Sequence, residues 1–317
     1  MLRATAASSW ALAVVIAFAT AAGPAFGHGF AGKRFFPATI ATDDPFVADE
    51  LSLPTVSRRE TAASEGEPAA TETATSMELS KRITPNLGLG FEATHLSLRS
   101  ADGEVRKGFD NLAASIKYQF YRSDEHETIV SAGLDWDIGG SGAERVGAES
   151  FSTLTPAVFF GKGFGDLGDG MKFLRPFAVT GSLGVALPTR SSTTTVDDMD
   201  AVVVEQHPDT LNVGLALEYS LPYLQSFVKD VGLREPFNRL IPVIEFVLEK
   251  PLDRGGGPTT GTVNPGILWT GRTMQLGLEA VVPINRATGG KTGVVLQVHF
   301  FLDDLFPRSL GRPIFAQ

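Results

Sequence analysis

The chain of 317 residues contains no cysteine, and after Ala22 it has no apolar run of helix-spanning length. Disulfides therefore cannot hold the fold. A membrane-spanning helix needs about 20 predominantly apolar residues, so any later insertion into a membrane must use strands. Basic residues are also in the minority, with 27 Lys and Arg against 36 Asp and Glu and a net charge of -9. Since nucleic-acid-binding surfaces cluster Lys and Arg, we expect no nucleic-acid partner.

The N-terminus has the three parts of a secretory signal peptide. Arg3 supplies a positive charge, Trp10–Ala22 is apolar, and Ala25–Gly27 offers small residues where a signal peptidase cuts. The apolar part is too short for a membrane anchor, which is the alternative interpretation. We therefore predict a signal peptide over 1–27, cleaved before His28.

Apolar and polar residues alternate through most of the remaining chain. In a strand, successive side chains point to opposite faces, so alternation with a period of two predicts a strand rather than a helix. The clearest segments are 112–121, 130–138, 211–221, 275–285 and 294–300. Weaker segments are 87–94, 153–160, 177–187, 242–249 and 263–270, with poorer candidates near 50–59 and 71–82. About twelve strands result, several of them with the roughly 9 to 11 residues that a tilted membrane strand needs.

The two faces of these strands differ in a way that favours a membrane barrel. One face is rich in Leu, Val, Ile and Phe, while the other holds Gly, Ser, Thr, Asn, Gln and carboxylates. Such strands fit a barrel with lipid outside and a polar lumen inside. A soluble sandwich or barrel is the alternative, but its outer surface would carry more Lys and Glu. We predict an all-β fold, a transmembrane antiparallel up-and-down β-barrel of about twelve strands in the bacterial outer membrane, with membrane lipid as a partner.

The connections support this topology because short and long ones alternate. Short turns are expected at 84–86, 123–127, 163–171 and 271–273, and longer polar loops at 100–110, 139–150, 189–209 and 252–261. Outer-membrane barrels place short turns on the periplasmic side and long loops outside. Two connections depart from the scheme: 287–290 is short on the outer side, and 222–239 is long on the inner side. The latter has apolar residues at helical spacing, which predicts a short amphipathic helix.

The face opposite the lipid supplies the predicted lumen-lining residues. They are Glu92, Lys117, Asp135, Asp137, Glu218, Glu245, Glu249, Glu279, Gln297 and His299. Because carboxylates dominate, an open lumen would favour cations through its summed field. The alternative is a closed barrel in which Lys117, water and protonated carboxyls balance the charges, since side chains can fill a lumen of this size.

No residue pattern predicts catalysis, a metal site or a cofactor. The histidines lie far apart without ligand spacing, and a copper site at a mature N-terminal His28 would need a second imidazole. His95 and Ser97 share one strand face, but a catalytic triad needs a third group and none can be assigned. We expect no enzyme activity and no cofactor.

The last strand, Lys291 to Val298, has a polar residue, a glycine and then alternating apolar residues, followed by Phe300 and Phe301. It resembles the signal that the barrel-assembly machinery reads, which would make that machinery a partner. The chain continues past it, to Gln317. Over about 70–302, the size, signal and strand number resemble outer-membrane transporters similar to the phenol meta-pathway barrel family. The resemblance is architectural and carries over no catalytic residue.

From the pattern and the resemblance we expect a channel for passive passage of an unidentified small solute. The alternatives are a structural or interaction barrel without an open pore, with 189–209 as its contact surface, and a lipid-active enzyme. The expected organisation is a signal peptide over 1–27, a periplasmic extension or plug over 28–48, a barrel over 49–302 and a C-terminal extension over 303–317. A mobile leader is the other interpretation of the second segment.

Overall fold

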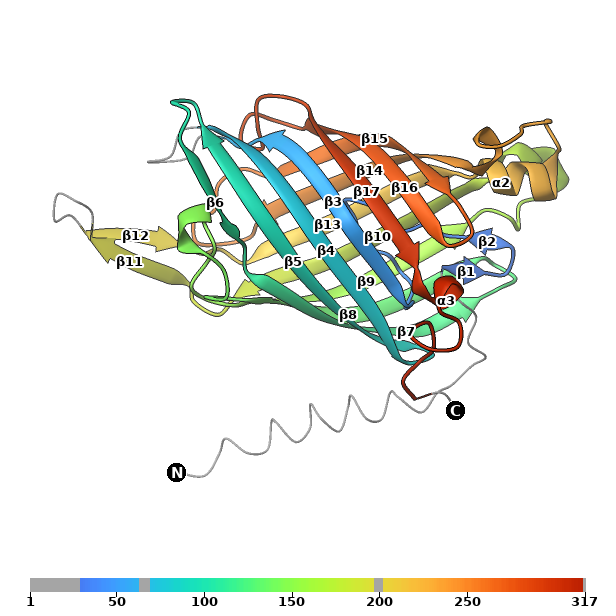
Figure 1. Ribbon diagram of the computed structural model, residues 1–317, viewed down its shortest axis with the longest axis horizontal. Helices are drawn as coiled ribbons and strands as arrows, with labels where there is room; N and C mark the ends of the chain where they lie inside the picture. The colour runs from blue at the N-terminus through green and yellow to red at the C-terminus, as the bar shows by residue number, and fades with distance from the viewer. Residues whose placement is uncertain (1–28, 63–68, 197–201, 316–317) are drawn as a thin grey trace.

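Twelve antiparallel strands form a closed barrel in the computed structural model, which describes residues 29–62, 69–196 and 202–315. Each strand pairs with its neighbour in sequence, and the last pairs with the first, so no barrel edge is left open (Figure 1). The strands are β3 (Glu50–Glu60), β4 (Ala70–Thr84), β5 (Leu87–Ser100), β7 (Leu112–Ser123), β8 (Thr128–Ile138), β9 (Thr153–Gly163), β10 (Phe177–Pro188), β13 (Thr210–Tyr219), β14 (Leu240–Pro251), β15 (Thr260–Thr270), β16 (Met274–Pro283) and β17 (Gly293–Phe301). The predicted fold class and strand number are confirmed, including the two poorest candidates, which form β3 and β4.

The alternation of each strand sorts apolar side chains outward and polar ones inward. On β16, Leu276 and Leu278 are 42% and 45% exposed, while Gln275 and Glu279 are 0% and 1% exposed. A soluble protein would bury the leucines and expose the polar side chains. The inverted arrangement is that of a barrel whose outer face meets lipid.

The two rims of the barrel are built differently. One rim, called the terminal rim here, carries the connections 85–86, 124–127, 164–176, 220–239 and 271–273 together with both ends of the described chain. The long connection at this rim forms the helical turns α2 (Leu221–Tyr223) and η3 (Leu224–Val228), as the helical spacing predicted. No helix in the described ranges is long and apolar enough to cross a membrane.

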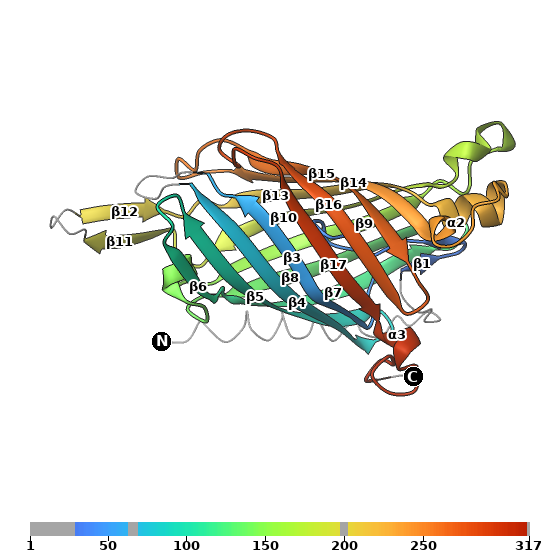
Figure 2. The same ribbon diagram turned by 45° about the horizontal axis from the view of Figure 1, so that its top comes forward.

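The opposite rim, the loop rim, contains strands that the sequence pattern did not predict. The loop expected over 100–110 contains β6 (Val105–Phe109), which pairs with the end of β5. The loop expected over 189–209 contains β11 (Ser192–Val196) and β12 (Val202–Gln206). These two strands project beyond the barrel (Figure 2). Because each of these strands pairs with a strand nearby in sequence, its backbone N–H and C=O groups are hydrogen-bonded. None of them needs the alternation of apolar and polar residues that marks a strand of the barrel wall.

Residues 29–49, called the plug here, lie inside the barrel. The segment begins with a small hairpin of β1 (Phe30–Ala31) and β2 (Arg34–Phe35) at the terminal rim. Phe36, which is fully buried, packs with Ile129 and Ala178 of the wall. Further along, Ile40 covers an apolar cluster on the inner wall around β13 to β15. The segment therefore fills part of the lumen with a packed core of its own.

The chain after the last strand folds back across the terminal rim. It forms α3 (Leu302–Leu305), and the backbone N–H of Phe315 donates to the carbonyl of Ile83, 2.8 Å away. Lys81 and Arg82 donate to carbonyls of this tail and also to Asp49, at the end of the plug. The tail and the plug are thus held by the same end of β4. The predicted signal peptide and His28 lie outside the described residues.

Candidate functional site

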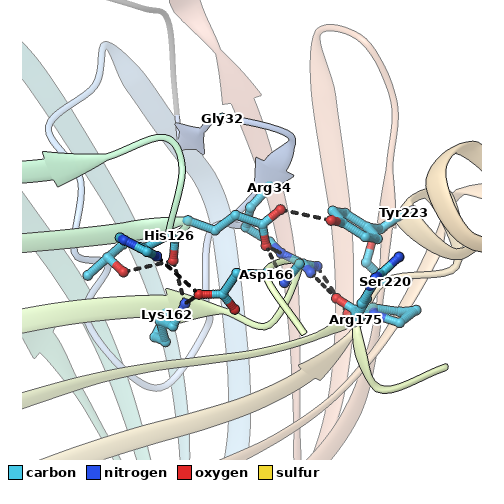
Figure 3. A network of polar contacts seen from close by, with 12 residues as sticks. Gly32, Arg34, His126, Lys162, Asp166, Arg175, Ser220 and Tyr223 are labelled. Atoms are coloured by element: carbon cyan, nitrogen blue, oxygen red, sulfur yellow. Dashed lines mark hydrogen bonds and ion pairs between the residues drawn. The ribbon is translucent and has the colours of Figure 1, made fainter. Parts of the chain in front are cut away.

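Arg34 anchors the plug to the terminal rim. Its side chain is 1% exposed, and Nε lies 3.2 Å from Oε2 of Glu127, whose side chain is 4% exposed. The guanidinium also donates to the carbonyl oxygens of Arg175 and Pro176 and lies 4.0 Å from the ring centroid of Tyr223 (Figure 3). A guanidinium has donors in a fixed fork and no acceptor, so this set of oxygens matches it.

Glu127 is fixed from the other side by two further contacts. The Tyr223 hydroxyl donates to Oε1 over 2.8 Å, and the backbone N–H of Gly165 donates to Oε2 over 3.0 Å. Burial and the neighbouring carboxylate of Glu127 raise the pKa of Tyr223 to about 12, so the phenol keeps its proton at neutral pH. We call Arg34, Glu127, Tyr223 and Gly165 the base network.

The turn beside the base network makes a second contact with the plug. The backbone N–H of Gly32 donates to Oδ1 of Asp124 over 3.0 Å. Gly32 has φ +59°, and a Cβ there would come within 2.2 Å of the Asp124 carbonyl oxygen, so glycine is required. The hydrogen bond from Arg122 lowers the pKa of Asp124, with a smaller contribution from Gly32. On the neighbouring turn, Lys162 and Asp166 form an ion pair of 2.8 Å (Figure 3).

The tip of the plug is held by one carboxylate of the wall. Glu245 on β14 is fully buried and accepts the backbone N–H groups of Ile40, Ala41 and Thr42 over 2.8, 2.9 and 2.7 Å. One side chain thus accepts three consecutive backbone donors of the plug. Wall side chains donate to three plug carbonyls: Gln275 to Ala38 over 2.6 Å, Lys117 to Asp44 over 2.7 Å, and Ser131 to Pro45. The plug is thus bound by several strands around the lumen.

Two cavities remain beside the plug, with volumes of about 270 and about 300 Å³. The first is lined by the plug from Ala38 to Ala48 and by β3, β4, β5, β7, β8 and β17; the second extends along β5 to β13. Their linings are mostly Ser, Thr, Asn, Gln and carboxylates. Asp43, Glu78, Glu92 and Asp135 line both cavities, and we call these four residues the junction.

The predicted lumen-lining residues fall into three groups, all on the inward face of their strands. Five line the first cavity: Glu92, Lys117, Asp135, Gln297 and His299. Three are buried on the inner side of the wall: Glu218, Glu245 and Glu279. Of these, Glu245 binds the plug. Two are exposed toward the loop rim: Asp137 and Glu249. That any of them lines a path for solute stays a prediction.

Sequence reasoning missed four carboxylates of the first cavity. Glu50 and Glu78 lie in β3 and β4, the two strands whose alternation is weakest. Asp43 and Asp44 lie in the plug, where no alternation exists to assign a face. For Glu78 a signal was available: it is the register partner of Glu92, which the pattern did place inward.

Neither a metal site nor a catalytic pair emerges from the described residues. Within those residues, no three His, Cys, Asp or Glu side chains are grouped closely enough to hold a metal ion. His95 and Ser97 lie on the same face of β5 as Leu89 and Phe91, which are exposed on the outside of the barrel. The His95 ring packs edge-on against Phe109, 5.3 Å between centroids.

A likeness to one solved structure supports the architecture. The chain is similar to an outer-membrane channel from Pseudomonas putida F1, with a TM-score of 0.55 and 12% identity over 84% of this chain and 99% of that one. The KdgM porin also matches, with a TM-score of 0.43 and 11% identity over 78% of this chain and 98% of that one. The NanC porin matches with a TM-score of 0.44 and 6% identity over 78% of this chain and 98% of that one. No family model and no curated protein matches the chain. At such low identity the first likeness shows the fold alone, and the lower TM-scores of the two porins carry no argument. The resemblance to the phenol meta-pathway family stays a prediction.

Proposed function

We propose that this protein is an outer-membrane channel for passive passage of small solutes, with the plug restricting its lumen. The observation that carries the proposal is the pair of polar cavities, of about 270 and 300 Å³, inside a closed barrel with an apolar outer face. A barrel serving only as a scaffold can fill its lumen with packed side chains. Here polar side chains line open space instead, which supports a solute path.

The charges along the cavities support a preference for cations. Carboxylates outnumber basic groups among the lining residues, of which Lys117 and His299 are the basic members. A low-dielectric wall around charges of one sign concentrates the field in the lumen. Cations would therefore enter more readily than anions.

The plug supports restricted rather than free passage. It is bound at its base by Arg34 and Glu127 and at its tip by Glu245. A solute must then pass beside the plug, through the two cavities, or wait until the plug loosens. Loosening at the base or the tip is therefore expected to increase flow.

The test is ion conductance of the full-length protein in planar lipid bilayers. We expect small, cation-selective currents, seen as a reversal potential in a KCl gradient, and larger currents when Arg34 is replaced by Ala. Arg286→Ala, which removes the same charge from an exposed loop, is the matched control for the charge effect. If neither the wild type nor Arg34→Ala conducts, the channel function is wrong.

A barrel that binds a partner and conducts nothing is the second candidate. It is favoured by the number of strands that bind the plug and by β11 and β12, which project beyond the loop rim (Figure 2). The same bilayer experiment separates the two functions, because a non-conducting barrel stays silent even after the plug is loosened. Localisation in the outer membrane, after cleavage of a signal peptide, is part of the proposal and is tested by membrane fractionation.

A further inference from the structure

The junction brings four carboxylates to the place where the two cavities meet. Asp43 comes from the plug, and Glu78, Glu92 and Asp135 come from β4, β5 and β8. The side chains of Glu78 and Glu92 are exposed to this internal space, because both point inward from their strands. These four side chains therefore border both cavities.

Glu78 and Glu92 are directly opposite one another in the register of β4 and β5. Like charges in directly opposed positions destabilise a sheet. An isolated pair of this kind is relieved by a cation between or above the two carboxylates. The strand register thus places two carboxyl groups in direct opposition at the junction.

The basic side chains of the cavity lining are engaged elsewhere. Lys117 Nζ donates to the carbonyl of Asp44 over 2.7 Å and lies 4.2 Å from the ring centroid of Phe159. His299 shares a hydrogen bond of 2.9 Å with Ser52 through Nδ1 and has Nε2 3.6 Å from Oε1 of Glu50. Neither forms an ion pair with a junction carboxylate in the described structure.

A buried acceptor in the same cavity lacks a donor. Gln297 is 6% exposed, lines the first cavity, and its Oε1 has no hydrogen-bond partner among the described residues. Buried polar atoms are nearly always paired, so this acceptor in the cavity wall is available to a ligand that brings a hydrogen-bond donor. This observation is independent of the carboxylates and points to the same kind of ligand.

The arrangement suits an organic cation better than a metal ion. No three acidic or histidine side chains of the described chain are close enough to share a metal, and the acceptors are spread over the plug and several strands. The cavities are near the lower end of the size of sites for small molecules, roughly 300 Å³. Ammonium groups at separate positions of one small molecule can reach separate acceptors.

We infer that the junction binds a small organic cation carrying one or more ammonium groups, and that such amines are the solute class of this barrel. The binding site is defined by Glu78, Glu92, Asp43 and Asp135, with Gln297 as a neutral acceptor in the adjoining wall. The assignment of the solute class rests on the proposed channel function, whereas the binding itself does not.

Calorimetric titration of the full-length protein in detergent with 1,4-diaminobutane tests the site. We expect saturable binding to the wild type and at least about tenfold weaker binding to Glu78→Gln and Glu92→Gln, since each loses a charge-assisted contact. Glu205→Gln removes the same charge from β12, outside the lumen, and is expected to bind as the wild type does. A heat-dependent shift in gel mobility shows that each variant has folded into a barrel.

Two further ligands decide what the site recognises. Binding of uncharged 1,4-butanediol with equal affinity, or unchanged affinity in both glutamate variants, overturns the proposal. The proposal is also overturned if Ca²⁺ displaces the diamine at equal concentration from the wild type but not from Glu78→Gln, since the site would then be a metal site. Diamine binding without bilayer conductance would leave the site standing and refute the channel. Conductance without diamine binding would leave the channel standing and refute the site.

Discussion

Arg34 and Glu127 form an ion pair that is buried on both sides, with 3.2 Å between Nε and Oε2. One partner belongs to the plug and the other to a turn of the barrel, 93 residues away in sequence. Because each charge depends on the other for compensation, the plug and the barrel are coupled at this point. Breaking a buried pair by removing one partner is costly, typically about 3–5 kcal/mol, since the remaining charge stays buried.

Replacing Arg34 by Ala is therefore expected to loosen the plug at its base. The docked state should lose about 3 kcal/mol or more, because Glu127 and the carbonyls of Arg175 and Pro176 lose their donor. Hydrogen exchange followed by mass spectrometry over 36–48 measures the loss of protection. Arg286→Ala, in an exposed loop, is the control. Unchanged protection in Arg34→Ala would show that the base does not hold the plug.

A methyl group at Gly165 should disturb the same base network from outside the plug. A Cβ there would meet Oε1 of Glu127 at 2.2 Å and the Tyr223 hydroxyl at 2.3 Å. Overpacking of this kind costs about 1–3 kcal/mol. Gly168 lies in the same connection with nothing within 4 Å of its Cβ position, so Gly168→Ala controls for the substitution itself. We expect faster exchange over 36–48 in Gly165→Ala only; equal exchange in both variants would contradict the contact.

The wall of the barrel could be predicted from the sequence because alternation reports the face of each side chain directly. Glu279 and Gln297 were assigned inward on that ground alone, and both are buried inside the barrel. Alternation does not report what an inward side chain meets. Glu245 and Glu249 have the same parity on β14, yet one binds the plug and the other is exposed toward the loop rim.

The sequence left a periplasmic extension, a plug and a mobile leader open for 28–48, and it could not decide among them because the tip of the plug is bound through its backbone. Ile40, Ala41 and Thr42 are bound through their N–H groups, and Ala38 through its carbonyl oxygen. Every residue carries these backbone groups, so no pattern of side chains marks the segment as a plug. Strand β6 was missed for a related reason, since it pairs with β5 outside the closed ring of strands.

Acid should weaken the contact between the plug hairpin and the turn after β7. The pKa of Asp124 is lowered below its ordinary value of 3.8 by Arg122 and by the N–H of Gly32. A carboxyl with a lowered pKa in the docked state contributes stability above about pH 4, and this contribution is lost as the pH falls through the lowered value. The amide exchange of Gly32, corrected for the intrinsic effect of pH, should therefore lose protection below about pH 4. Asp124→Asn should remove that pH dependence, and if the dependence persists, another group causes it.

Removing the Glu245 carboxylate is expected to free the tip of the plug while the base remains docked. Glu245→Ala leaves three partly buried N–H groups at Ile40, Ala41 and Thr42 without this acceptor. A fully buried unsatisfied group costs about 1–3 kcal/mol, and these partly buried groups should cost less. Glu245→Gln keeps an oxygen that can accept part of this set, so its effect should be smaller. Hydrogen exchange resolved over 38–44 and over 30–36 separates the tip from the base, and Glu249→Ala on the same strand is the control. Hydrogen exchange at the tip is expected to be fastest in Glu245→Ala, slower in Glu245→Gln and slowest in the wild type. Exchange at the base is expected to be the same in all three. Equal exchange in tip and base would mean that the plug moves as one body, and access to the lumen would then be controlled at Arg34 instead of at Glu245.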